Sequence, residues 1–177
     1  MAEESSGGIA RSAGLIGLGN VASRLLGLAR VTIIVHLFGT SGPASAFEVA
    51  TRVPTMIYDF LISGMLSAAL VPVLSEYAGR EQRDELWRLA SVLLTITALL
   101  MGALVLVLEL FAPTVAWLMA GGFDPELLAL TTRLLRLVLP ATLFFGLSGV
   151  ATGILYSLRR FRYPAFGAAV YNLGIVI

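Results

Sequence analysis

The chain contains no cysteine and no lysine, and its one histidine is His36. Without cysteine there is no disulfide framework, no thiolate metal site and no cysteine nucleophile. A lone histidine leaves little material for a metal site or a serine–histidine–acid triad. The sequence therefore predicts neither catalytic residues nor a bound metal or cofactor, and we do not expect an enzyme.

Charge is also scarce. Charged residues make up 13% of the 177 residues, hydrophobic residues make up 58%, and the mean hydropathy is +0.90. A soluble domain has about 25% charged and about 45–50% apolar residues, so this chain falls outside that class. The net charge of +1 comes without a basic tract, which argues against a nucleic-acid partner. The composition predicts an all-α fold, a polytopic transmembrane helix bundle.

Apolar runs and turn residues divide the chain into a tail and five expected helices. The tail covers residues 1–12, and the helices cover residues 13–38, 46–77, 86–112, 125–158 and 164–177. The fourth is longer than one bilayer crossing requires, so we expect tilt, a kink at Pro140 or an extension beyond the lipid. The fifth has 14 residues and climbs roughly 21 Å, less than the roughly 30 Å of hydrocarbon. We therefore expect a truncated last helix and an N-terminal fragment of a longer protein.

The outer end of the third expected helix carries Glu109 and Pro113, and Trp117 beyond it suits an interfacial anchor. Seven of the twelve arginines flank the helices on one side only. They are Arg11, Arg80, Arg83, Arg88, Arg159, Arg160 and Arg162. The connections 39–45 and 121–126 contain no arginine. This alternation predicts a multi-pass protein whose N-terminal tail is cytoplasmic, and the acidic first ten residues argue against a cleaved signal peptide.

The other five arginines fall inside the apolar runs, where charge is costly and usually functional. They are Arg24, Arg30, Arg52, Arg133 and Arg136. At 100° per residue, Asn20 and Arg24 share one face of the first helix, and Glu48, Arg52 and Asp59 share one face of the second. We interpret these residues as the lining of a hydrated, net cationic interior. Guanidinium groups match phosphate oxygens, so the expected substrate is anionic or phosphorylated.

Structural interpretations of the same residues stay open. Arg24 pairs with Glu48 or Asp59 if its role is to hold helices together. Arg30 and Arg133 snorkel to the outer interface if they lie near the helix ends. Asp59 is a candidate for ion coupling or for a structural ion pair. Gly17-Leu-Gly19-Asn-Val-Ala22 matches a dinucleotide-binding pattern, but inside an apolar helix it indicates close helix packing instead.

Longer strings carry a resemblance to a known family. The strings are Ser23-Arg24-Leu-Leu-Gly27-Leu-Ala-Arg30, then Ala46-Phe47 with Ala50, Arg52 and Pro54, and Arg160-Phe161 with Pro164-Ala165-Phe166 and Asn172. Their order and spacing resemble the MurJ/MviN family of lipid II flippases in the MOP superfamily. The resemblance implies the N-terminal lobe of a larger transporter. It implies alternating-access movement of an undecaprenyl-diphosphate-linked oligosaccharide from the inner to the outer leaflet of the bacterial cytoplasmic membrane, for peptidoglycan and cell shape.

The resemblance also implies that Arg24, Arg30 and Arg52 recognise the diphosphate, and that the partners are membrane lipid and the remainder of the protein's own chain. Four positions depart from the family pattern of charged residues: Val31, Ser45, Tyr58 and Ser63. Two alternatives stay open. The chain belongs to another MOP exporter, such as a polysaccharide-unit flippase, or it is a membrane fragment that transports nothing.

Overall fold

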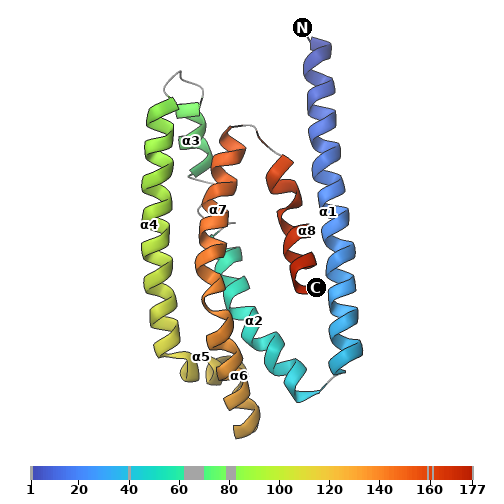
Figure 1. Cartoon of the computed structure of the whole chain (residues 1–177), viewed down its shortest axis with the longest axis vertical. Coiled ribbons are helices and arrows are strands. Elements are labelled where there is room, and N and C mark those ends of the chain that lie inside the picture. Colours follow the sequence, from blue (N-terminus) through green and yellow to red (C-terminus); the bar gives the residue numbers. More distant parts are fainter. Residues whose placement is uncertain are drawn as a thin grey trace. The chain divides into compact units, whose positions relative to one another are not determined.

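The computed structural model describes residues 2–39, 41–61, 70–78, 83–158, 160 and 162–176. All regular secondary structure in these residues is helical, which confirms the expected all-α class (Figure 1). The chain divides into two compact units, and each is described by itself. Unit 1 comprises Met1–Gly39 and Arg159–Ile177, and unit 2 comprises Thr40–Leu158.

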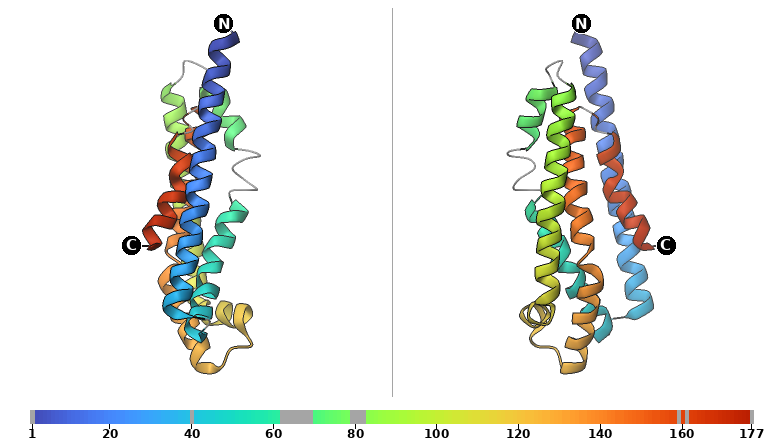
Figure 2. Two further views of the ribbon diagram at one scale, coloured as in Figure 1. Left: turned by 90° about the vertical axis from the view of Figure 1, so that its right-hand side faces the viewer. Right: turned by 60° about the vertical axis from the view of Figure 1, so that its left-hand side comes forward.

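Unit 1 contains α1 (Ala2–Phe38) and α8 (Arg162–Val176), which lie side by side and run in the same direction (Figures 1 and 2). The Asn172 side-chain nitrogen donates to the backbone oxygen of Ser23 at 3.2 Å and to its hydroxyl at 3.3 Å. Gly27 faces the same amide, because a Cβ there would lie 3.8 Å from Asn172 Nδ2. A small residue on α1 and a polar residue on α8 thus bring the two helices together, as is common inside membranes.

The start of α1 differs from the expected boundary. The sequence predicts a tail over residues 1–12, whereas the structure begins the helix at Ala2. Its other end is as expected, since Gly39 follows Phe38 with a φ of +61°, and its N–H donates to the Val35 carbonyl at 2.8 Å. Glycine adopts this left-handed conformation without the Cβ clash that other residues meet, so it terminates the helix.

Among the residues that the structure describes, unit 2 contains six helices. They are α2 (Gly42–Leu61), α3 (Val71–Ala78), α4 (Arg83–Leu110), α5 (Ala112–Ala120), α6 (Pro125–Val138) and α7 (Ala141–Ser157). Figures 1 and 2 show α4 and α7 packed side by side in opposite directions. Gly146 of α7 allows this approach, because a Cβ at that position would lie 2.6 Å from Met101 Cγ of α4.

The core of unit 2 has two buried clusters. One joins α2, α5 and the α6–α7 junction, and its members are Ala50, Val53, Ala112, Ala116, Leu135 and Leu139. The other joins α3, α4 and α7, and its members are Leu74, Leu86, Ala90, Val150 and Ile154. The end of unit 2 that holds α5 also holds the first turns of α2 and α6, where Leu127 lies 3.3 Å from a Cβ built on Gly42. We call it the α5 end.

Two of the expected helices are divided in the structure. The expected helix over 46–77 corresponds to α2 and α3, and residues 62–69 lie outside the described residues. The expected helix over 125–158 corresponds to α6 and α7, which meet in a kink at Leu139 and Pro140, where φ and ψ remain right-handed helical. Proline has no N–H to donate and its ring clashes with the preceding turn, which accounts for a break at this position.

Three stretches among the described residues are long and apolar enough to cross a membrane: Gly17–Phe38, Asp84–Leu110 and Pro125–Ser157. The 22 residues of the first rise about 33 Å, which matches the hydrocarbon thickness of about 30 Å. On α4, large apolar side chains remain exposed, among them Leu99, Leu106 and Leu110. Such a surface suits acyl chains, so these lengths and surfaces fit a multi-pass membrane protein.

Candidate substrate-binding residues

The candidate residues of unit 1 lie on two sides of α1. Asn20 and Arg24 are exposed, as their shared face predicts. Arg30 is half-buried, and by helical phase it lies on the side of Ser23 and Gly27, which contact α8. Arg24 and Arg30 therefore lie on different sides of α1, about 120° apart by helical phase.

The Arg30 side chain has one buried hydrogen-bond donor that is not paired within the described residues. Its Nε atom is buried and has no hydrogen-bond partner among the residues that the structure describes. Buried donors in proteins are nearly always satisfied by protein, water or ligand, and a guanidinium always carries its charge. Arg30 is therefore suited to a hydrogen bond with water or with an anionic group.

The polar residues of α2 share one exposed face. Glu48, Arg52 and Asp59 are all exposed, whereas Ala50 and Val53 on the other side of the helix are buried in the core. The hydroxyls of the nearby Thr51 and Thr55 donate to backbone oxygens of their own helix, so they do not pair with the charged side chains of this face. The helical period thus gathers the predicted charges of α2 along a single line.

Glu48 and Arg52 form the ion pair that their i,i+4 spacing predicts. Glu48 Oε1 lies 3.8 Å from Arg52 Nη2, and the two side chains are 73% and 64% exposed. A pair this long and this exposed to water contributes about 0–1 kcal/mol, so it holds neither partner firmly. Arg52 therefore keeps N–H donors that can bind a further anionic group.

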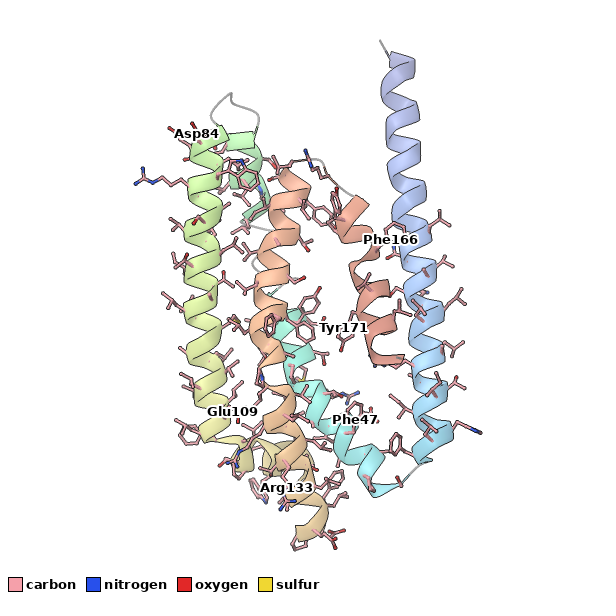
Figure 3. The ribbon with its side chains drawn as sticks, viewed as in Figure 1. Phe47, Asp84, Glu109, Arg133, Phe166 and Tyr171 are labelled. Carbon is pink, nitrogen blue, oxygen red and sulfur yellow. The ribbon has the colours of Figure 1, made fainter. Side chains whose placement is uncertain are left out.

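Arg133 and Arg136 lie elsewhere, on the exposed side of α6. Figure 3 shows Arg133 near the α5 end of unit 2, with Glu109 of α4 at the same end and Asp84 at the opposite one. Asp124 caps α6, because its Oδ1 accepts a hydrogen bond from the Leu127 N–H at 2.9 Å. These two arginines therefore belong to one end of unit 2, away from Asp84.

An aromatic pair joins α2 to α7, and the sequence analysis did not single it out. The ring centroids of Tyr58 and Phe145 lie 5.3 Å apart with the planes tilted by 57°, a favourable arrangement for aromatic rings. Asp59 and Tyr156 are within electrostatic range of the Tyr58 hydroxyl. The sequence pattern that could have revealed this face is the spacing of Phe145, Thr152 and Tyr156, since positions i, i+7 and i+11 fall on one face of a helix.

The structure thus places Arg24 and Arg30 on α1 in unit 1 and Arg52 on α2 in unit 2. Their convergence on one ligand stays a prediction. Among the described residues, no group of three or more His, Cys, Asp or Glu side chains is placed to hold a metal ion. The chemistry on offer is that of guanidinium, carboxylate, amide and phenol groups, which bind by charge and hydrogen bonds.

Comparison with known families gives a match to most of the chain. The family model described as "Lipid II flippase MurJ" matches residues 34–177. That stretch contains the polar face of α2, the aromatic pair and both arginines of α6, whereas the Arg24 and Arg30 positions on α1 lie before it.

Individual relatives extend the match toward the N-terminus. The lipid II flippase MurJ of Burkholderia cenocepacia is 31% identical over 156 residues, which are 87% of this chain and 30% of that protein. The one from Thermosipho africanus is 30% identical over 155 residues, or 88% of this chain and 32% of that protein. A probable lipid II flippase MurJ of Synechocystis is 28% identical over 179 residues, covering 98% and 32%. The chain spans about a third of the length of these curated relatives.

Proposed function

Because this chain belongs to the lipid II flippase MurJ family, we propose that it takes part in moving a lipid-linked peptidoglycan precursor from the inner to the outer leaflet of the bacterial cytoplasmic membrane. The proposed substrate is an undecaprenyl-diphosphate-linked oligosaccharide, and the proposed mode is alternating access without a catalytic step. The arginine distribution supports a cytoplasmic N-terminus. The activity is that of the whole transporter to which these helices contribute.

The observation that carries this proposal is the charged, exposed face of α2. Glu48, Arg52 and Asp59 lie along it, and the opposite side of the helix packs into the core. The α2 helix packs against α6 and α7, which form the candidate membrane span Pro125–Ser157. Charged side chains at that depth are costly in hydrocarbon, so such residues face a hydrated cavity or other protein. A line of charges on a packed helix of a membrane protein thus supports a water-filled path for a polar headgroup.

The type of charge favours a phosphate-bearing ligand. A guanidinium offers a planar fork of donors that fits two phosphate oxygens at once, which an ammonium cannot do. Arg24 and Arg52 are exposed, and Arg30 has a buried Nε without a partner among the described residues. We assign diphosphate binding to these three arginines, with Asn20 as a further hydrogen-bonding group on the same side of α1 as Arg24.

The Glu48–Arg52 pair supplies a way to bind and release. At 3.8 Å and with both side chains exposed, it is weak enough for a diphosphate to displace Glu48 from Arg52. When the substrate leaves, Glu48 again neutralises the arginine, so the emptied cavity does not hold an uncompensated charge. This exchange favours turnover, because an arginine without a competing carboxylate would retain the anion.

The test uses bacteria depleted of their own flippase and supplied with the full-length gene of the transporter to which this chain contributes. Accessibility of lipid II at the outer surface reports transport. We expect the unmodified gene to restore accessibility and Arg24→Ala together with Arg52→Ala to abolish the restoration at equal protein levels. Arg88→Ala removes an exposed arginine in the first turns of α4 and is the matched control, with transport expected to remain.

A rescue that survives the double substitution would remove the phosphate-binding role from both arginines. Failure of the unmodified gene to restore accessibility, with the protein present in the membrane, would contradict lipid II as the substrate. Arg52→Lys adds a finer comparison. It keeps the charge but loses the bidentate fork, so partial activity is expected.

A further inference from the structure

One face of unit 2 combines aromatic rings with hydroxyl groups at the junction of α2 and α7. The Tyr58 and Phe145 rings hold the two helices together, with centroids 5.3 Å apart. Both side chains are half-buried, so each ring is partly accessible. The phosphate-binding role proposed above assigns no function to these two rings.

The α7 side of this face continues with polar residues. Thr152 and Tyr156 follow Phe145 at i+7 and i+11, and Ser148 lies beside them at i+3. Ser148 is exposed, Thr152 is half-buried, and Tyr156 is 39% exposed. On the opposite side of α7, Val150 and Ile154 are buried in the core.

The α2 side adds a phenol and a carboxylate. Asp59 is exposed, and together with Tyr156 it lies within electrostatic range of the Tyr58 hydroxyl. The face therefore presents aromatic carbon, hydroxyl groups and one acid, and its members include no cation. A phosphate would find no counter-charge among these groups.

A sugar ring matches this set of groups. Its axial C–H bonds form an apolar patch that packs on an aromatic ring, and its hydroxyls donate to carboxylate and phenol oxygens and accept from phenol and serine hydroxyls. The distance along α2 also fits. Asp59 is seven residues from Arg52, which is a rise of about 10 Å, comparable to the separation between a diphosphate and the sugars attached to it.

We propose that Tyr58, Asp59, Phe145 and Tyr156 form a carbohydrate subsite that contacts the sugar of the lipid-linked substrate while the arginines contact its diphosphate. This inference rests on the proposed function. The subsite bears on which sugars the transporter accepts. Tyr58 and Asp59 hydrogen-bond the sugar, and Tyr156 packs against its ring.

The experiment compares two lipids on the full-length gene product in nanodiscs. Lipid II carries the disaccharide, whereas undecaprenyl diphosphate lacks it. Native mass spectrometry measures the binding of each lipid. Tyr156→Leu removes a ring and a hydroxyl, whereas Tyr58→Phe removes only a hydroxyl and keeps the ring against Phe145. Tyr163→Leu, at a 67% exposed tyrosine of α8, is the matched control.

We expect both variants to bind lipid II about threefold to tenfold more weakly, the loss of one or two hydrogen bonds or ring contacts, and to bind undecaprenyl diphosphate as before. The control variant should bind both lipids like the unmodified protein. Because Tyr58→Phe preserves the aromatic pair, a selective loss in that variant reports on the sugar contact and not on folding.

The alternative outcomes separate the two proposals. If the unmodified protein binds both lipids equally, or if the variants weaken both equally, the subsite is wrong and the proposed function stands. If the variants bind lipid II like the unmodified protein, the subsite is likewise wrong. If the unmodified protein binds neither lipid, the proposed function fails and the subsite fails with it.

Discussion

Asn172 of α8 forms hydrogen bonds with Ser23 of α1 within unit 1. Its side-chain nitrogen reaches both the backbone oxygen and the hydroxyl of Ser23. Hydrogen bonds between membrane helices contribute about 0.6 kcal/mol on average and up to about 1.7 kcal/mol. We expect Asn172→Ala to lower the stability of the purified protein by about 0.5–1.5 kcal/mol, measured by thermal unfolding in detergent.

Ser23→Ala is the matched change on α1. It removes the hydroxyl and leaves the backbone oxygen in place, so its effect should be smaller than that of Asn172→Ala. The double variant should lose less stability than the two single variants added together, because both remove the same contact. Strictly additive losses would mean that Asn172 stabilises the protein through some other contact.

Single residues also show where sequence reasoning ends. The exposed line of Glu48, Arg52 and Asp59 on α2 follows from helical period alone, because one side of that helix is apolar. The half-burial of Arg30 does not, since it depends on which side of α1 receives α8. A helix with small residues on several sides does not specify that choice, and the partner helix is more than a hundred residues away in the sequence.

At the scale of the helix, α4 and α7 depend on Gly146. A Cβ at this position would lie 2.6 Å from Met101 Cγ and 3.4 Å from Thr97 Cγ2, so a larger side chain has no room. Overpacking of a close contact costs about 1–3 kcal/mol. We expect Gly146→Leu to destabilise the protein by this amount in detergent unfolding. Gly102→Leu on α4 is the control, because nothing lies within 4 Å of a Cβ there, and an equal loss in both variants would contradict the role of Gly146.

The helices that sequence analysis recovered best are the long apolar ones, since twenty or more apolar residues have one stable state in lipid. It did not foresee α5 as a separate helix. Pro113 was taken as the end of the third helix, but in the structure it lies at the first turn of the nine-residue α5. Proline is equally suited to follow one helix and to begin the next, so the residue alone does not decide. In this chain, Pro113 begins a new helix because Ala112 and Ala116 of α5 pack in one buried cluster with Leu135 and Leu139.

At the scale of the whole molecule, the question is which ends of the helices lie on which side of the membrane. The 33 residues Pro125–Ser157 rise about 50 Å, well beyond a hydrocarbon layer of about 30 Å. Since α7 is the more apolar part and α6 carries Arg133 and Arg136, the part of this length that extends beyond the hydrocarbon layer belongs to α6. The α5 end of unit 2, with its exposed Trp117, then lies at an interface, and the arginine distribution predicts that it is the outer one.

The absence of native cysteine makes this topology open to a direct test. Gly122→Cys places a thiol at an exposed position in the connection before α6, and Glu85→Cys places one in the exposed first turn of α4. A membrane-impermeant maleimide applied to intact spheroplasts should label Cys at 122 and not at 85, while lysed membranes should be labelled at both. The two positions lie at opposite ends of α4 and its continuation through α5, so each serves as the control for the other. The reverse pattern would place the arginine-rich connections outside and would contradict a cytoplasmic N-terminus.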